Sequence, residues 1–231
     1  MRRRPAPLLA RALVLVAALA AGGCGDGEDD GRSAEPAGVL SVDQIEDILL
    51  PVGATVGDAT VNRKAGINFI DDRRASPESC QPLSSIIRLE PHPVHSDRVE
   101  ASPRWISPYG DVQVLTYAGD DAAKVFAAVD RAIDDCANGF AAELIRRYVV
   151  LDVVRDTAPP LGDEALAFGL RTHEIDEEEP IDEHEHRVLV RDGQHLLSWR
   201  TTGLEDDGAV EARDLLTAFV DAQWARYAER R

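Results

Sequence analysis

His184 and His186 lie where metal-ligating residue types are most concentrated in the sequence, in the segment 172–187, THEIDEEEPIDEHEHR. Imidazole nitrogens and carboxylate oxygens are ligands that zinc takes from proteins. Because side chains two residues apart on a strand share a face, these two histidines could bind one cation, with a third ligand from Glu177, Glu178 or Glu179. The alternative is an exposed acidic loop, since runs of like charge are usually solvated. Nothing in the sequence fixes a third ligand or its supporting contacts, so we favour the loop.

The dipeptide Asp192-Gly193 predicts the tight turn of a β-hairpin that would position these histidines. With both residues in the loop, Val190 lies opposite His195, and His186 lies opposite Trp199. His186 and His195 are then about 13 Å apart along the strands. We therefore expect that these two side chains do not share a metal ion.

Sequence motifs of well-known catalytic centres do not occur in this chain. It contains no G-x-S-x-G nucleophile elbow, no H-E-x-x-H zinc motif, no P-loop and no Rossmann glycine pattern. Pairs of carboxylates such as Asp134-Asp135 are frequent in so acidic a chain and carry no information. We expect no enzymatic activity and no cofactor, and keep a secreted hydrolase with an unfamiliar site as a third-ranked alternative.

Cys24 is the residue whose thiol chemistry is best defined by its neighbours. It directly follows Ala21, Gly22 and Gly23, which resembles the lipobox, the small-residue motif at which bacteria attach diacylglycerol before cleavage. Ala21 departs from the leucine that the lipobox prefers at that position. We expect lipidation of Cys24 by long acyl chains such as palmitate, because two or three chains anchor a protein stably. A plain signal peptide with an incidental cysteine is the alternative.

Residues 1–23 have the features of a secretory signal peptide. Three arginines follow Met1, and the apolar run 12–21 is ten residues long, about half of the roughly 20 that a membrane-spanning helix needs. Residues 24–40 are rich in Gly and Asp and predict a flexible acidic linker. We therefore expect an exported protein, anchored through Cys24 to the outer face of the cytoplasmic membrane, with an extracellular domain over residues 41–231.

The charge of the mature chain excludes two classes of partner. The precursor has 25 basic and 42 acidic residues, and removal of residues 1–23 deletes four arginines and no acid. The net charge then becomes −21. So negative a surface is repelled by nucleic acids and by anionic lipid headgroups, so the attachment to the membrane has to be covalent.

Cys80 and Cys136 are the two cysteines left once Cys24 carries lipid. Export places them in an oxidising compartment, where a disulfide between them is the expected state. Two free thiols are the alternative. Their separation excludes a C-x-x-C redox motif.

The elements that must position these residues follow from periodicity and capping. A capping box of Ser41 and Gln44 begins a short helix that Pro51 ends; apolar residues at helical spacing predict two further helices, near 120–138 and 208–227. Segments rich in β-branched or alternating apolar residues predict strands around 99–105, 111–117, 148–154, 165–172, 185–191 and 194–201. The sequence therefore predicts an α+β fold, a mainly antiparallel twisted sheet flanked by about three helices.

A set of short motifs spans most of residues 41–228: a first helix ending in Leu49-Leu50, Pro77-x-x-Cys80 with Leu83, the helix ending at Cys136, Leu161-Gly162-Asp163-Glu164-Ala165, and the hairpin 188–197. Together they resemble the extracellular sensor domain of actinobacterial PknH-type serine/threonine kinases and the lipoproteins that share it. The chain departs from the family in having one available cysteine pair, where members often have two, and a longer acidic insertion at 175–185.

The resemblance implies a non-catalytic sensor domain with a cleft for an extracellular ligand. No kinase domain occurs in this chain, so a signal would have to pass to a separate protein partner of unknown identity. Our first hypothesis is a lipid-anchored domain that binds a small molecule or a cell-envelope component in an apolar cleft. A metal- or cation-binding envelope lipoprotein that uses His184 and His186 ranks second.

Overall fold

The computed structural model describes seven ranges of the chain. They are residues 39–63, 74–87, 99–100, 104–106, 110–142, 148–174 and 182–230. The expected signal peptide 1–23, Cys24 and most of the expected linker 24–40 lie outside these ranges. Val39 is buried and Leu40 N donates to Thr116 Oγ1, so the last two residues of that linker segment belong to the fold.

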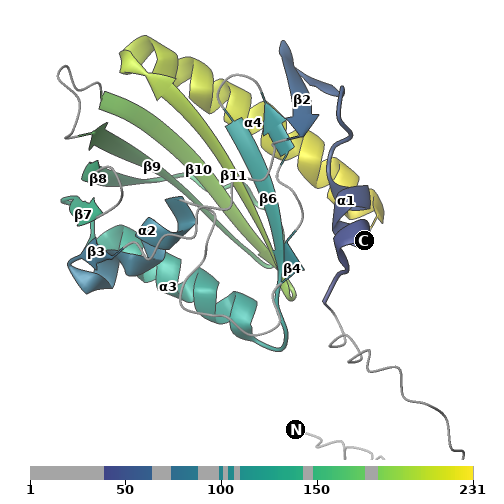
Figure 1. Ribbon diagram of the computed structural model, residues 1–231, viewed down its shortest axis with the longest axis horizontal. Coiled ribbons are helices and arrows are strands. Elements are labelled where there is room, and N and C mark those ends of the chain that lie inside the picture. The colour runs from purple at the N-terminus through teal and green to yellow at the C-terminus, as the bar shows by residue number, and fades with distance from the viewer. Residues whose placement is uncertain are drawn as a thin grey trace, which may run out of the picture. The chain divides into compact units, whose positions relative to one another are not determined.

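An antiparallel sheet forms the centre of the domain (Figure 1). Its described strands are β1 (Thr55–Val56), β2 (Ala59–Arg63), β3 (Ala75–Ser76), β4 (Val99–Glu100), β5 (Arg104–Ile106), β6 (Gly110–Thr116), β7 (Phe140–Ala142), β8 (Tyr148–Asp156), β9 (Glu164–Glu174), β10 (Asp182–Asp192) and β11 (His195–Leu204). They pair in the order β1-β2-β5-β6-β11-β10-β9-β8-β7-β3, and β4 also pairs with β6. The α+β prediction is confirmed.

Four helices occur in the described part of the chain, against about three predicted. They are α1 (Val42–Ile48), α2 (Gln81–Ile87), α3 (Asp121–Asp135) and α4 (Glu205–Arg230). The capping box at the start of α1 is present, since Gln44 N donates to Ser41 Oγ and Ser41 N donates to Gln44 Oε1. The unpredicted helix is α2, which follows a 3-10 turn at Glu78–Cys80. No helix in the described ranges is long and apolar enough to cross a bilayer.

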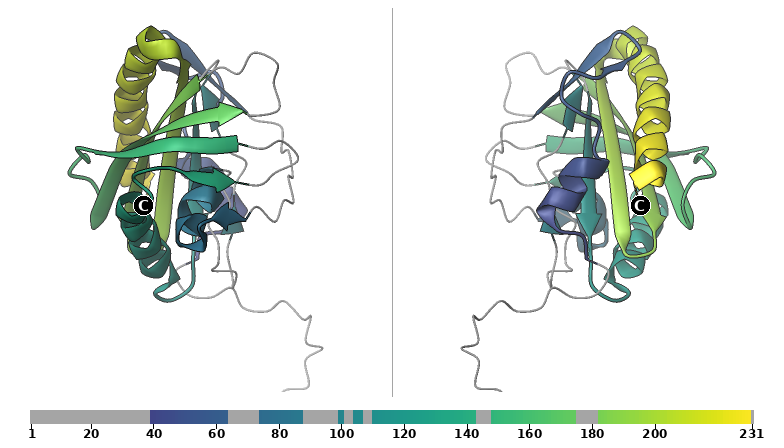
Figure 2. Two further views of the ribbon diagram at one scale, coloured as in Figure 1. Left: turned by 90° about the vertical axis from the view of Figure 1, so that its left-hand side faces the viewer. Right: turned by 90° about the vertical axis from the view of Figure 1, so that its right-hand side faces the viewer.

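The two faces of the sheet pack against different helices (Figure 2). Leu189 of β10 lies in one core with α2 and α3, and its neighbours Val188 and Val190 lie in a second core with α1 and α4. This division follows from the period of two along a strand. We call the two sides the α3 face and the α4 face.

The α4 helix holds α1 through a buried glutamine. Gln223 Nε2 donates to Ile48 O at 2.7 Å, and its Oε1 accepts from Leu50 N at 2.8 Å. The last carbonyls of a helix have no partner within the helix. Gln223 therefore satisfies the end of α1 and fixes that helix to α4.

The β10–β11 turn lies one residue later than predicted. Asp192 pairs with His195 and Val190 with Leu197, so Gly193 and Gln194 form the loop. The register differs from the predicted one by two residues, and every side chain therefore keeps its predicted face.

A segment distant in sequence clamps this turn in place. Asp163 accepts from Gly193 N at 2.9 Å and from Arg191 Nη1 at 3.0 Å. Gly162 has a φ of +61°, and a Cβ there would lie 2.4 Å from Arg191 O, so the close approach requires glycine. The motif 161–165 thus fixes the position of the turn.

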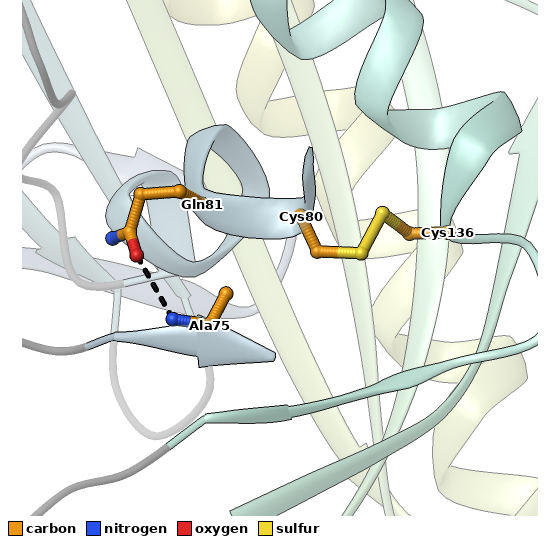
Figure 3. The surroundings of a disulfide bond; sticks show 4 residues. All are labelled: Ala75, Cys80, Gln81 and Cys136. Carbon is orange, nitrogen blue, oxygen red and sulfur yellow. Dashed lines mark hydrogen bonds between the residues drawn. A yellow bond between two sulfur atoms is a disulfide. The ribbon is translucent and has the colours of Figure 1, made fainter. Parts of the chain in front are cut away.

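A disulfide joins Cys80, at the start of α2, to Cys136, at the end of α3 (Figure 3). The expected pairing is therefore present. Both half-cystines are buried in the core of the α3 face. The bridge closes a loop with a sequence separation of 56, which the chain-entropy estimate values at about 4 kcal/mol.

We predict that Gln223→Met destabilises the fold by about 2 kcal/mol, because it leaves the buried Ile48 O and Leu50 N without their partner. Denaturant unfolding measures the loss. Gln194→Met is the matched control, since Gln194 Nε2 donates to Gly119 O at an exposed site, and it should cost less than about 0.5 kcal/mol. Equal losses for the two variants would contradict the role given to Gln223.

Candidate functional site

The α3 face changes from apolar to polar along its central strands. Leu115, Leu166 and Leu189 belong to the core under α3. Further along the same strands, five side chains form what we call the buried polar cluster: Asp111 and Gln113 of β6, Arg200 of β11, and Glu185 and Arg187 of β10. Asp111, Arg200 and Arg187 are directly opposed in register across three adjacent strands.

Four members of the cluster form a continuous ion network. Arg200 Nη2 lies 2.7 Å from Asp111 Oδ2, and Arg200 Nη1 lies 3.6 Å from Glu185 Oε2. Glu185 Oε1 in turn accepts a hydrogen bond from Arg187 Nε. The network contains two arginines and two carboxylates, and the charge of Glu183, two residues before Glu185 on β10, also acts on Arg200.

The carboxylates allow two arginines to face each other across neighbouring strands. Like charges directly opposed on a sheet destabilise it, but Asp111 and Glu185 each neutralise one guanidinium. Burial acts to lower the pKa of Arg200, while the charges of Asp111 and Glu185 outweigh it and raise the pKa above its ordinary value. Arg200 thus remains charged beneath the surface.

Arg187 also connects the network to α2. Its side chain is 1% exposed, and its Nη1 donates to Ile86 O at 2.8 Å near the end of the helix. Because the final carbonyls of a short helix need external partners, this contact holds the end of α2 against the sheet. The disulfide at Cys80 holds its beginning.

Two acceptor atoms of the cluster are buried without a donor from the described residues. They are Asp111 Oδ1 and Gln113 Oε1, from residues that are 0% and 4% exposed. Ser84 Oγ, on α2 two residues before Ile86, is a third buried atom of this kind. Buried polar groups in native proteins nearly always have partners, so these three atoms are exceptions within the described residues.

Arg200 is the accessible member of the cluster. Its side chain is 20% exposed, whereas Asp111 has no exposed side-chain surface. The Nη1 group lies 3.6 Å from its nearest recorded carboxylate oxygen, beyond hydrogen-bond distance. The Arg200 guanidinium is therefore the part of the ion network that solvent reaches, while Asp111 Oδ1 and Gln113 Oε1 stay buried.

His184 and His186 share the α4 face, as the alternation along β10 predicts. His186 lies across from Gly169, and His184 pairs with Arg171. Arg171 contacts Asp152 and Asp182. Within the described residues, no three His, Cys, Asp or Glu side chains are grouped to hold a metal ion, and Glu177, Glu178 and Glu179 fall outside those residues.

Asp182, the carboxylate of β10 that shares the α4 face with the two histidines, already has partners. Asp182 Oδ1 lies 2.8 Å from His173 Nδ1 and Asp182 Oδ2 lies 3.5 Å from Arg171 Nη1. The hydrogen bond with His173, followed by the nearby positive charges, lowers the pKa of Asp182. These contacts do not favour a cation at this end of the hairpin, because Arg171 would repel it.

One contact between a hydroxyl and an imidazole occurs on the α4 face. His195 Nδ1 lies 3.1 Å from Thr116 Oγ1, an arrangement that a hydrolase could use. Thr116, however, has no exposed surface, and its Oγ1 accepts from Leu40 N. The pair is part of the strand pairing and gives a substrate no access to the hydroxyl.

Glu185 lies in a less exposed environment than its acidic neighbours predict. It ends the expected acidic insertion at 175–185 and begins the expected strand 185–191, but β10 already begins at Asp182 and Glu185 is buried. The alternation of Glu183, Glu185, Arg187 and Leu189 was the available signal, since all four share one face. Their partners on β6 and β11 are remote in sequence and could not be inferred locally.

We predict that Arg187→Met destabilises the protein by about 3–5 kcal/mol, because the change removes the charged partner of Glu185 and leaves that carboxylate buried. The double change Glu185→Met and Arg187→Met should cost less than the single change, since two apolar side chains replace the whole pair. Denaturant unfolding of the two variants and of Glu185→Met gives the coupling energy. A single-variant loss below about 1 kcal/mol would show that the pair is not desolvated.

Comparison with solved structures gives a weak likeness in fold. The chain matches no model of a protein family, and no curated protein matches it in sequence. Among solved structures it is similar to the extracellular domain of PknH from Mycobacterium tuberculosis, with a TM-score of 0.41 and 10% sequence identity, over 80% of this chain and 97% of that chain. A likeness this weak assigns neither a family nor a ligand to the chain.

Proposed function

We propose that this chain is an exported, lipid-anchored protein whose α+β domain binds a small molecule or a cell-envelope component without catalysing a reaction. Cys24 would carry the lipid and residues 25–38 would separate the domain from the membrane. The disulfide between Cys80 and Cys136 supports export, because such bonds persist in oxidising compartments.

The observation that carries the binding role is the partly exposed guanidinium of Arg200, whose Nη1 has no carboxylate oxygen within hydrogen-bond distance among the described residues. An acceptor group of a ligand could take a charge-assisted hydrogen bond from it. On the neighbouring strand β6, Asp111 Oδ1 and Gln113 Oε1 are buried without donors, and each such atom costs about 1–3 kcal/mol. The proposed site is polar, in contrast to the apolar cleft that we expected from the sequence.

We also propose that the domain catalyses no reaction, because the chemistry of the cluster does not suit catalysis. Its members Asp111, Glu185, Arg187 and Arg200 are engaged with one another. The cluster itself includes neither a hydroxyl or thiol nucleophile nor a histidine base. A binding protein needs neither, because it holds its ligand without making or breaking bonds. In a sensor, the bound state would then be read by a separate protein.

We predict that Cys24→Ala releases the protein from the membrane fraction into the medium or periplasm and abolishes incorporation of labelled palmitate. Without acyl chains, no covalent anchor offsets the repulsion between a chain of net charge −21 and anionic lipid. Cell fractionation with immunodetection checks this outcome, and Ser33→Ala in the linker is the matched control. Wild type that is membrane-bound and unacylated would contradict the proposed anchor.

We predict that the full mature protein, purified from its own host in detergent, retains a small molecule. Native mass spectrometry of the folded protein should show an added mass that disappears on denaturation. Arg200→Met should lower its occupancy, because the accessible guanidinium contributes a charge-assisted hydrogen bond. The binding role would be contradicted if the measured mass equalled that of the lipid-bearing protein alone. That result would leave the proposed anchor intact.

A further inference from the structure

The turn between α3 and β7 contains a chemically labile pair of residues. Asn138-Gly139 is the only Asn-Gly pair in the sequence, and Asn138 is exposed. Glycine has no side chain to hinder an attack by its own main-chain nitrogen on the preceding asparagine. We propose that Asn138 is a site of spontaneous deamidation, which the closed turn slows and which proceeds when the turn opens. We call residues 136–140 the Asn138 turn.

The reaction takes place between two adjacent residues. Gly139 N loses its proton and attacks Asn138 Cγ, so that a new C–N bond closes a succinimide ring and the side-chain nitrogen leaves as ammonia. Water then opens the ring at either carbonyl and gives aspartate or isoaspartate. The reaction needs water and no oxidant or reductant. Each product carries one negative charge where asparagine carries none.

The folded turn keeps the nucleophilic nitrogen occupied. Gly139 N donates to Cys136 O at 2.8 Å, and the attack requires this hydrogen bond to break. Gly139 has a φ of +86°, and a Cβ there would collide with Val150 O and Leu151 O. The main chain of Gly139 therefore packs directly against β8, and ring closure has to lift it from that strand.

The residues on both sides of the pair are also bonded to β8. Ala137 O accepts from Val153 N at 3.3 Å. Phe140 pairs with Val150 and is buried in the core of the α3 face. Asn138 is thus an exposed residue within a segment whose main chain is fixed at both ends. Deamidation consequently depends on a local opening of this segment, because such openings occur more often than global unfolding.

The disulfide is the covalent constraint on the Asn138 turn. It joins Cys136, whose carbonyl oxygen holds Gly139 N, to Cys80 (Figure 3). Reduction removes this constraint and gives the turn more freedom to open. We therefore expect the rate of deamidation to depend on the redox state of the two cysteines.

The products fit the closed turn less well than asparagine does. Isoaspartate adds a main-chain carbon between Ala137 and Phe140, which are both bonded to β8. The new charge also follows Asp134 and Asp135 at the end of α3, where the helix dipole disfavours negative charge. Deamidation therefore favours the open turn, and the change is not reversed when the disulfide forms again.

The experiment measures deamidation at position 138 in the full mature protein in detergent, at mildly alkaline pH, where the amide proton is lost faster. Oxidised, reduced and urea-unfolded oxidised samples are compared by peptide mapping of aspartate and isoaspartate. Asn62, which is exposed and followed by arginine, is the internal control. We expect the folded oxidised protein to react more slowly than the unfolded protein by about tenfold or more. Reduction should accelerate the reaction of the folded protein by about threefold or more.

Gln223→Met separates local opening from a general loss of stability. Gln223 joins α1 to α4, so this variant is destabilised without a change at the Asn138 turn. Its rate of deamidation should stay within about twofold of the wild-type rate. Asn138→Gln is the blank, because glutamine would have to close a larger ring, and it should show no deamidation at this position over the same time.

Arg155→Met replaces reduction if circular dichroism shows that the reduced protein unfolds. Arg155 joins β8 to α3 through Asp130 at 2.8 Å and Asp134 at 3.1 Å, close to the contact of Val153 with the turn. Its loss should loosen α3 from β8 and accelerate deamidation by about twofold or more, while the disulfide stays intact.

Equal rates in the folded and the urea-unfolded protein would overturn the proposal, because the turn would then give no protection. Acceleration in Gln223→Met equal to that in the loosened protein would overturn it as well, since global unfolding would then control the reaction. Asn62 reacting as fast as Asn138 in urea would contradict the role of Gly139. Finally, oxidised protein with isoaspartate at position 138 should melt at a lower temperature than unmodified protein, and equal melting temperatures would contradict the effect on the closed turn.

Discussion

The register between β10 and its two neighbours is the constraint on which both cores and the polar cluster depend. Val188 and Val190 pack toward α4, while Glu185, Arg187 and Leu189 lie on the α3 face. A slip by one residue would exchange these sets, because the side chains of a strand alternate. Arg187 would then enter an apolar core without its carboxylate. The ion network therefore penalises the wrong register in addition to the apolar contacts that favour the right one.

Much of this architecture could be predicted because it is local. Alternation identified the long strands, helical spacing identified α3 and α4, and the capping box of Ser41 and Gln44 began α1 where predicted. Helix α2 was missed because its first residues, Gln81-Pro82, and its serines are typical of turns, although proline is tolerated in the first turn of a helix. The turn of the main hairpin was misplaced by one residue because Asp163, about 30 residues upstream, sets its position.

The polar cluster could not be predicted for a different physical reason. A charged side chain in a single sequence is assumed to face water, and burial becomes acceptable only when a partner is known. Arg200 finds Asp111 at a separation of 89 residues, and Arg187 finds Ile86 O at a separation of 101. Such pairs are products of the tertiary fold. In contrast, the motifs that carry the resemblance to sensor domains are the turn clamp at 161–165, the hairpin 188–197, the end of α1 and the two cysteines of the disulfide. None of the five residues of the cluster belongs to these motifs, so the resemblance concerns the fold more than the ligand.

The placement of the cluster on a central strand has a consequence for how a tethered protein would work. Strand β6 carries Asp111 and Gln113 on its α3 face and Thr116 on its α4 face, where Thr116 Oγ1 accepts from Leu40 N. The part of the chain that would lead from the proposed anchor is thus bonded to the strand that supports the proposed site. A site on a strand in the middle of a sheet is held more rigidly than one on loops. Within the proposed function, this arrangement fixes the position of the ligand relative to the point where the tether enters the domain. The same cluster also contacts α2, because Arg187 donates to Ile86 O.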